Sequence, residues 1–288
     1  MTVDISGGLY RLTLFNYVSI SNVLYAAGRA GAALANGDTS HAWSIPSISD
    51  YTPERDSLVK TERMSGDKKK PGLMFGSAYL KGFKAKLSDV QTSIITAAHG
   101  TSIDETTSSV WDIWTEDTNA VAVANLGMIL TALAEDQDTG ATVFDNLILP
   151  MAKAVFSIAK GKPQAMDEVD IDVIVKASKR TPWGSLVSAL GISAPDGEVS
   201  GLHIRTSHPL ALTVFRSDAT DTSFITQYRP ASTVVTDNAT PNYFTRNGVD
   251  QALTSIVTTT GVATMAAAGT AGDMNILLYE ANDNFVLI

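Results

Sequence analysis

One acidic group has the residue types and spacing to bind a metal ion, and it comprises Asp167, Glu168, Asp170 and Asp172. Glu168, Asp170 and Asp172 alternate with valine and isoleucine, so they face outward from a predicted strand. Outward carboxylates can bind Ca²⁺ or Mg²⁺ if a second loop supplies further oxygens. The segment lacks the EF-hand pattern and its turning glycine, so we favour a solvated strand face or one lining a negative channel.

Other catalytic and binding motifs are missing from the sequence. The four histidines, at positions 41, 99, 203 and 208, have no zinc-motif spacing. Gly161-Lys162 is not part of a phosphate-binding loop, and no dinucleotide fingerprint or nucleophile elbow occurs. We therefore predict no catalytic residue, no bound metal and no cofactor, with an enzyme kept only as a minor alternative.

The pattern of apolar residues predicts an α+β fold that is mostly β, an antiparallel β barrel or sandwich. Strands are expected where apolar and polar residues alternate, as in Asp167 to Lys176, and also over Leu210 to Arg216 and Met274 to Glu280. A short helix is expected over Asp89 to Ala98, before Gly100.

Two middle segments predict helices. Ala120 to Ala134 has no polar face, which is typical of a helix buried all round, and Ala141 to Lys160 is predicted as a helix bent near Pro150. The chain thus divides into a β-rich part (1–118) with a protruding basic loop (54–70), a helical segment (119–165) and a strand-rich C-terminal part (166–288).

Charge is unevenly distributed along the chain. Residues 53–86 contain nine Lys or Arg against four Asp or Glu, whereas residues 87–172 contain three against fourteen. In an assembly, a basic loop on one copy can meet an acidic face on the next and fix their register. The net charge of −9 argues against a nucleic-acid binder.

Five features follow one another within about residues 43–100. They are Ser44 to Ile48, a polar segment ending at Gly66, Gly72-Leu73, the strand Ser77 to Phe83 and a short helix ending at Gly100. This order of features resembles that of the tube proteins of contractile phage tails.

This resemblance implies hexameric rings joined through barrel edges and stacked through the loop at 54–70. The interface candidates are Lys68, Lys69, Lys70, Tyr79 and Phe83. It also implies an acidic lumen through which DNA passes without specific binding, and Glu168, Asp170 and Asp172 are candidates to line it. The partners would be copies of the chain and other virion proteins, in a virion assembled in the host cytoplasm.

Two further functions remain open. The low charged content and the Thr-rich late strands fit a capsid shell subunit equally well. Trp43, Trp111, Trp114 and Trp183 could instead stack on sugars in a carbohydrate- or ligand-binding β domain. No membrane partner is expected, because the most apolar run is too short to cross a bilayer.

Overall fold

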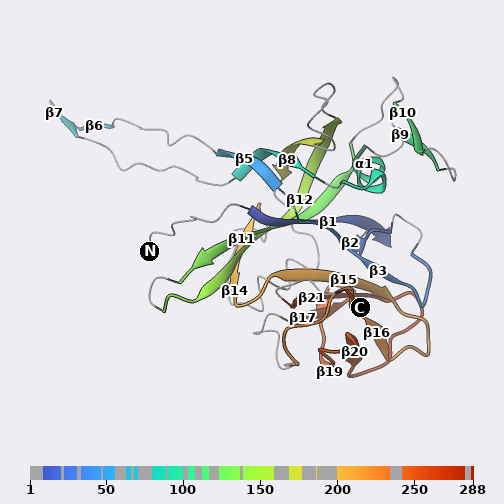
Figure 1. Cartoon of the computed structure of the whole chain (residues 1–288). Coiled ribbons are helices and arrows are strands. Elements are labelled where there is room, and N and C mark those ends of the chain that lie inside the picture. Colours follow the sequence, from blue (N-terminus) through green and yellow to red (C-terminus); the bar gives the residue numbers. More distant parts are fainter. Residues whose placement is uncertain are drawn as a thin grey trace.

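The computed structural model shows a mostly β, antiparallel protein built from stacked sheets (Figure 1). It describes residues 9–20, 23–30, 34–46, 48–55, 63–65, 68–70, 80–88, 90–99, 103–107, 112–116, 123–136, 139–158, 169–176, 186, 200–233, 242–282 and 287–288.

The largest sheet has nine strands. They are β1 (Leu9–Ile20), β2 (Val23–Gly28), β4 (Trp43–Ile45), β5 (Ile48–Arg55), β8 (Leu80–Leu87), β11 (Asn125–Glu135), β12 (Thr142–Ile158), β13 (Val169–Lys176) and β14 (Leu202–Thr206). The order is β2-β1-β11-β12-β13-β8-β5, with β4 beside β1 and β14 beside β12. Since β2 and β5 end this order without pairing to each other, the predicted barrel is not closed and a sandwich describes the fold.

Two smaller sheets complete the stack. The five-stranded sheet has the order β18 (Val249–Asp250), β17 (Tyr243–Arg246), β21 (Met274–Glu280), β15 (Leu210–Arg216) and β3 (Thr39–His41). The three-stranded sheet has the order β16 (Ser223–Ile225), β20 (Val262–Met265) and β19 (Leu253–Ile256).

Two separate hairpins and one helix make up the remaining described elements. The hairpins are β6 (Arg63–Ser65) with β7 (Lys68–Lys70), and β9 (Ile103–Thr107) with β10 (Asp112–Glu116). The helix α1 spans Thr92–His99 and buries Ile94, Ile95 and Ala98, as the predicted short helix requires.

Three apolar clusters hold the layers together. The first lies inside the curve of the nine-stranded sheet, beneath α1. The second joins that sheet to the five-stranded sheet, for example through Phe15, Ile129 and Leu212. The third joins the five-stranded to the three-stranded sheet, through Phe215, Phe224 and others. The five-stranded sheet is therefore covered on both faces.

The helical middle segment predicted from sequence is wrong. The described parts of the two segments predicted as helices, 123–134 and 141–158, instead lie largely in β11 and β12, which pair antiparallel over ten residues of register. Strand β11 sends Met128 and Leu130 into the first cluster and Ile129 into the second. A strand buried on both faces loses its alternation of apolar and polar residues, so its sequence looks like a buried helix.

Pro150 lies at a β-bulge rather than a helix kink. The β11–β12 register shifts between Leu126/Ala152 and Met128/Leu149, so Pro150 lies where the ladder is interrupted. A proline is tolerated there because its missing N–H costs no ladder hydrogen bond. The Tyr17 hydroxyl donates a hydrogen bond to the Pro150 carbonyl.

The bulge also divides the pairing of β12. The strand pairs with β14 before it, over Phe144–Ile148, and with β13 after it, over Met151–Ile158. One strand therefore connects the region that packs on the five-stranded sheet with the region that carries β13, β8 and β5. All three sequence-predicted parts contribute strands to this single nine-stranded sheet.

Candidate assembly surface

Charged side chains of alternating sign cross the outer face of β5, β8 and β13, which we call the striped face. Its charged residues include Asp50 and Glu54 on β5, Lys84 and Lys86 on β8, and Asp170 and Asp172 on β13, and Lys176 at the end of β13 shares this face. In register, Lys84 lies opposite Asp172 and Lys86 opposite Asp170. The ammonium group of Lys84 lies 3.6 Å from the Asp172 carboxylate, and that of Lys86 lies 3.0 Å from the Asp50 carboxylate.

These ion pairs stabilise the chain only weakly. Their side chains are 40–68% exposed, and exposed pairs contribute about 0–1 kcal/mol each. Their main effect is on strand register, because a one-residue slip would turn the charges of β13 into the core. From the sequence we expected basic and acidic residues to meet between copies. Lys84 and Lys86 instead pair with acidic residues of their own chain.

Two exposed apolar side chains interrupt the striped face. Ile174 on β13 is 61% exposed, and Val155 on the neighbouring β12 is 42% exposed. Val155 lies opposite Asp172 in register, and Ile174 is two residues further along β13, so both share the face of the charges. The sequence analysis assigned Val169, Ile171, Val173 and Val175 to the inward row and did not consider Ile174, although the same alternation places it outward with Asp170 and Asp172.

The predicted acidic strand is confirmed in its orientation for the residues that the structure describes. Val169, Ile171 and Val173 are buried, and Asp170 and Asp172 are exposed. Glu168 lies outside the described residues. The two aspartates face lysines of β8 on one side, which makes this face mixed in sign rather than uniformly acidic.

The candidate interface residues lie in different environments. Phe83 is 1% exposed and packs in the first cluster, so its side chain offers no surface to a partner in this fold. Its strand, β8, lies between β13 and β5 and is not an edge. Lys68, Lys69 and Lys70 form β7, which pairs with β6 and with no other described strand. Tyr79 lies outside the described residues. Figure 1 shows β6 and β7 away from the stacked sheets.

Trp43, one of the four tryptophans considered for sugar stacking, is buried. It is 3% exposed and belongs to the first cluster, beside Leu14, its partner on β1. Its ring faces are therefore covered by protein.

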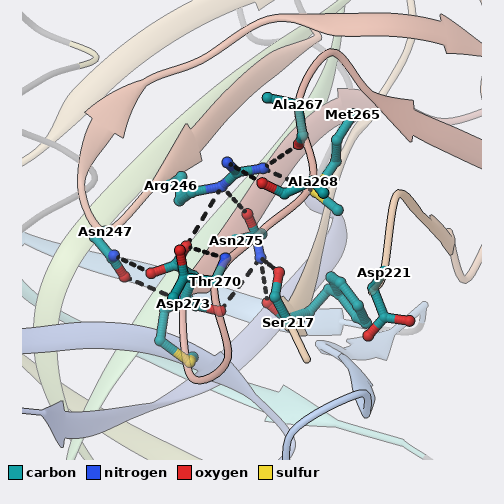
Figure 2. Close-up of polar contacts among 12 residues, drawn as sticks. Ser217, Asp221, Arg246, Asn247, Met265, Ala267, Ala268, Thr270, Asp273 and Asn275 are labelled. Atoms are coloured by element: carbon teal, nitrogen blue, oxygen red, sulfur yellow. Dashed lines mark hydrogen bonds and ion pairs between the residues drawn. The ribbon is translucent and has the colours of Figure 1, made fainter. Parts of the chain in front are cut away.

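A polar cluster at one end of the five-stranded sheet links charged, amide and backbone groups (Figure 2). Arg246 donates hydrogen bonds to the Asn275 side chain (3.0 Å) and to the carbonyl groups of Ala267 (2.7 Å) and Ala268 (3.1 Å). Its Nε lies 3.9 Å from Asp273 Oδ2.

The carboxylate of Asp273 completes this polar cluster. It accepts hydrogen bonds from the Asn247 side chain (2.7 Å) and from the Thr270 N–H (2.8 Å). Asn247 has a φ of 48° and Gly248 one of 74°, as a tight Asn-Gly turn between β17 and β18 requires. Since these groups bond to one another, the cluster anchors the segment between β20 and β21 and so fixes the three-stranded sheet against the five-stranded one.

Two titratable groups outside this polar cluster have shifted pKa values. Burial, aided by the positive charge of Arg29, lowers the pKa of His41 to about 4, so this histidine is neutral at pH 7. The His203 side chain, as hydrogen-bond partner, lowers the pKa of Asp145. Within the described residues, no group of three or more His, Cys, Asp or Glu side chains is placed to hold a metal ion.

No family model, curated protein or solved structure matches this chain. In the part of the chain that the structure describes, no helix has the length and apolar character to span a membrane.

Proposed function

We propose that the chain is a structural subunit that assembles with copies of itself through the striped face, without catalysing a reaction. The observation that carries the proposal is the exposure of Ile174 and Val155 among paired charges. Protein interfaces combine an apolar centre with a polar rim, and apolar side chains on a strand face lose unfavourable contact with water when a second copy covers them.

The charges of this face favour one orientation between copies. Asp50 and Glu54 on β5, Lys84 and Lys86 on β8, and Asp170 and Asp172 on β13 form parallel stripes of alternating sign. A second copy shifted by one strand therefore places lysines over acidic residues. The same copy placed without the shift sets like charges opposite one another, which is unfavourable. Assembly through this surface is therefore directional.

Within this class, we propose the tail tube of a tailed phage as the assembly. The proposal rests on the resemblance over residues 43–100, and the separate β6–β7 hairpin with its three lysines fits a contact between stacked rings. In this proposal the partners are further copies and other virion proteins, in a virion assembled in the host cytoplasm, and DNA passes through without specific binding.

Negative-stain imaging of the purified chain, at increasing concentration, tests the proposal. Rings or tubes are the expected particles. Closed shells would replace the tube by a capsid subunit while keeping self-assembly. A chain that stays a single particle at every concentration would contradict both, and the carbohydrate-binding alternative would then be tested by a glycan array.

A further inference from the structure

The outer face of the three-stranded sheet carries no charge, and we call it the charge-free face. It comprises Ser223 and Ile225 on β16, Val262 and Thr264 on β20, Ser255 on β19 and Val257 just after it. Register pairs Ser223 and Ser255 with Thr264, and Ile225 with Val262, while the Val257 N–H donates to the Val262 carbonyl. Two cross-strand rows result, one hydroxylated and one apolar.

The opposite face of these strands is fully used inside the protein. Phe224, Ala263 and Ile256 point into the third cluster and are at most 4% exposed. The neighbouring residues in each strand therefore point outward. Figure 1 shows this sheet as the outermost layer, beyond β17 and β21.

Exposed apolar side chains gather at this sheet. Of the eight large apolar side chains that are exposed in the described part, Ile225 (51%) and Val257 (37%) lie on this face, and Ile288 (51%) lies against Gly261, just before β20. The Ile288 N–H donates to the Gln227 carbonyl, and its side chain rests on Gly261, where a Cβ would come within 1.9 Å of it. The Ile288 side chain thus lies next to the start of β20, which carries Val262.

We infer that the charge-free face binds the same face of a second copy. The chain has a net charge of −9, so two copies repel each other wherever their acidic surfaces approach. Two copies can bring their charge-free faces together without repulsion between charged side chains on those faces. The rows of this face are also self-complementary, because apolar side chains can pack on apolar ones while serine and threonine hydroxyls both donate and accept hydrogen bonds.

The size of the face makes this contact weak on its own. Three strands about 4.8 Å apart and about four residues long cover roughly 200 Å², well below the roughly 800 Å² per partner of a stable interface. The contact is therefore weak, and it forms between chains at high protein concentration without help from the striped face. It goes beyond the proposed function, because it lies on a different sheet from the striped face.

Crosslinking of a single introduced thiol tests the inference. The chain has no cysteine, so Thr264→Cys on the central strand supplies the sole thiol. The matched control is Val249→Cys on β18, a position that is 61% exposed on another sheet. With a short bismaleimide, we expect Thr264→Cys to form covalent dimers about tenfold faster than the control, because a preformed contact raises the effective concentration of the two thiols.

A second substitution separates this contact from assembly through the striped face. Ile225→Lys places a charge in the centre of the apolar row and should reduce the dimer yield of Thr264→Cys to that of the control. The measurement is repeated with Ile174→Lys, which charges the striped face instead, and the fast crosslinking should persist. Equal rates for both cysteines, or a dimer yield unaffected by Ile225→Lys, would overturn the like-on-like contact and leave the proposed function standing.

Discussion

Replacing Asn146 by leucine should destabilise the protein by about 3 kcal/mol. Asn146 is completely buried on β12. Its side-chain oxygen accepts hydrogen bonds from the Thr131 hydroxyl (2.9 Å) and the Leu210 N–H (3.3 Å), and its amide nitrogen donates to the Thr206 hydroxyl (2.8 Å). One side chain thus connects β11, β12, β14 and the start of β15.

The magnitude follows from the groups that leucine leaves without a partner. The Leu210 N–H and the Thr131 hydroxyl both stay buried, and each unsatisfied buried polar group costs about 1–3 kcal/mol. Burying the leucine side chain returns part of this, about 1 kcal/mol. The hydroxyl of Thr206 keeps its bond to the His208 carbonyl. The net loss is therefore about 3 kcal/mol.

Urea denaturation measures this loss as a lower midpoint at an unchanged slope. Asn146→Leu combined with Thr131→Val should recover about 1 kcal/mol, because the orphaned hydroxyl is removed. Asn125→Leu, at an exposed position of β11, is the control and should change stability by less than about 0.5 kcal/mol. A loss for Asn146→Leu no larger than for this control would refute the buried pairing of β11 with β12.

Three further substitutions test other parts of the fold. Thr245→Val should stabilise the protein by about 1 kcal/mol and so raise its melting temperature, because the hydroxyl of Thr245 is buried without a hydrogen-bond partner. A lower melting temperature would contradict this. His41→Gln should flatten the pH dependence of stability. The wild type loses stability as pH falls from about 6.5 toward 4. In this window His41 of the unfolded chain binds a proton, whereas His41 of the folded chain, with a pKa of about 4, stays neutral. If the free energy of unfolding changed equally with pH for both proteins across this window, the reasoning would be false. Arg246→Lys should cost about 2 kcal/mol in urea denaturation, since an ammonium group cannot reach the Asn275, Ala267 and Ala268 oxygens together; an unchanged midpoint would argue against the polar cluster as an anchor.

Strands with one solvated face could be predicted from the sequence. The alternation in Val169 to Lys176 gave both the strand and the orientation of Asp170 and Asp172. The predicted bounds of β15 and β21 agree with the structure, because short, mostly apolar runs between turn residues favour strands even when both faces are buried.

The middle of the chain could not be predicted in the same way. Strand β11 contains leucine, alanine and methionine, which favour helices, and its burial on both faces removes the period of two. What makes it a strand is tertiary: β1 and β12 pair with its two edges, and these partners are distant in sequence or themselves ambiguous. The outward position of Ile174, in contrast, follows from the same alternation that orients Asp170 and Asp172, and its residue type alone would have suggested burial.

Static light scattering on three proteins tests most directly whether copies meet through the striped face. Ile174→Lys charges that face, and Val249→Lys makes the same change at a position equally exposed, 61%, on β18. We predict that the wild type and Val249→Lys reach the same high mass as concentration rises, while Ile174→Lys stays far below them. Equal masses for all three proteins would contradict the assembly surface proposed for this chain.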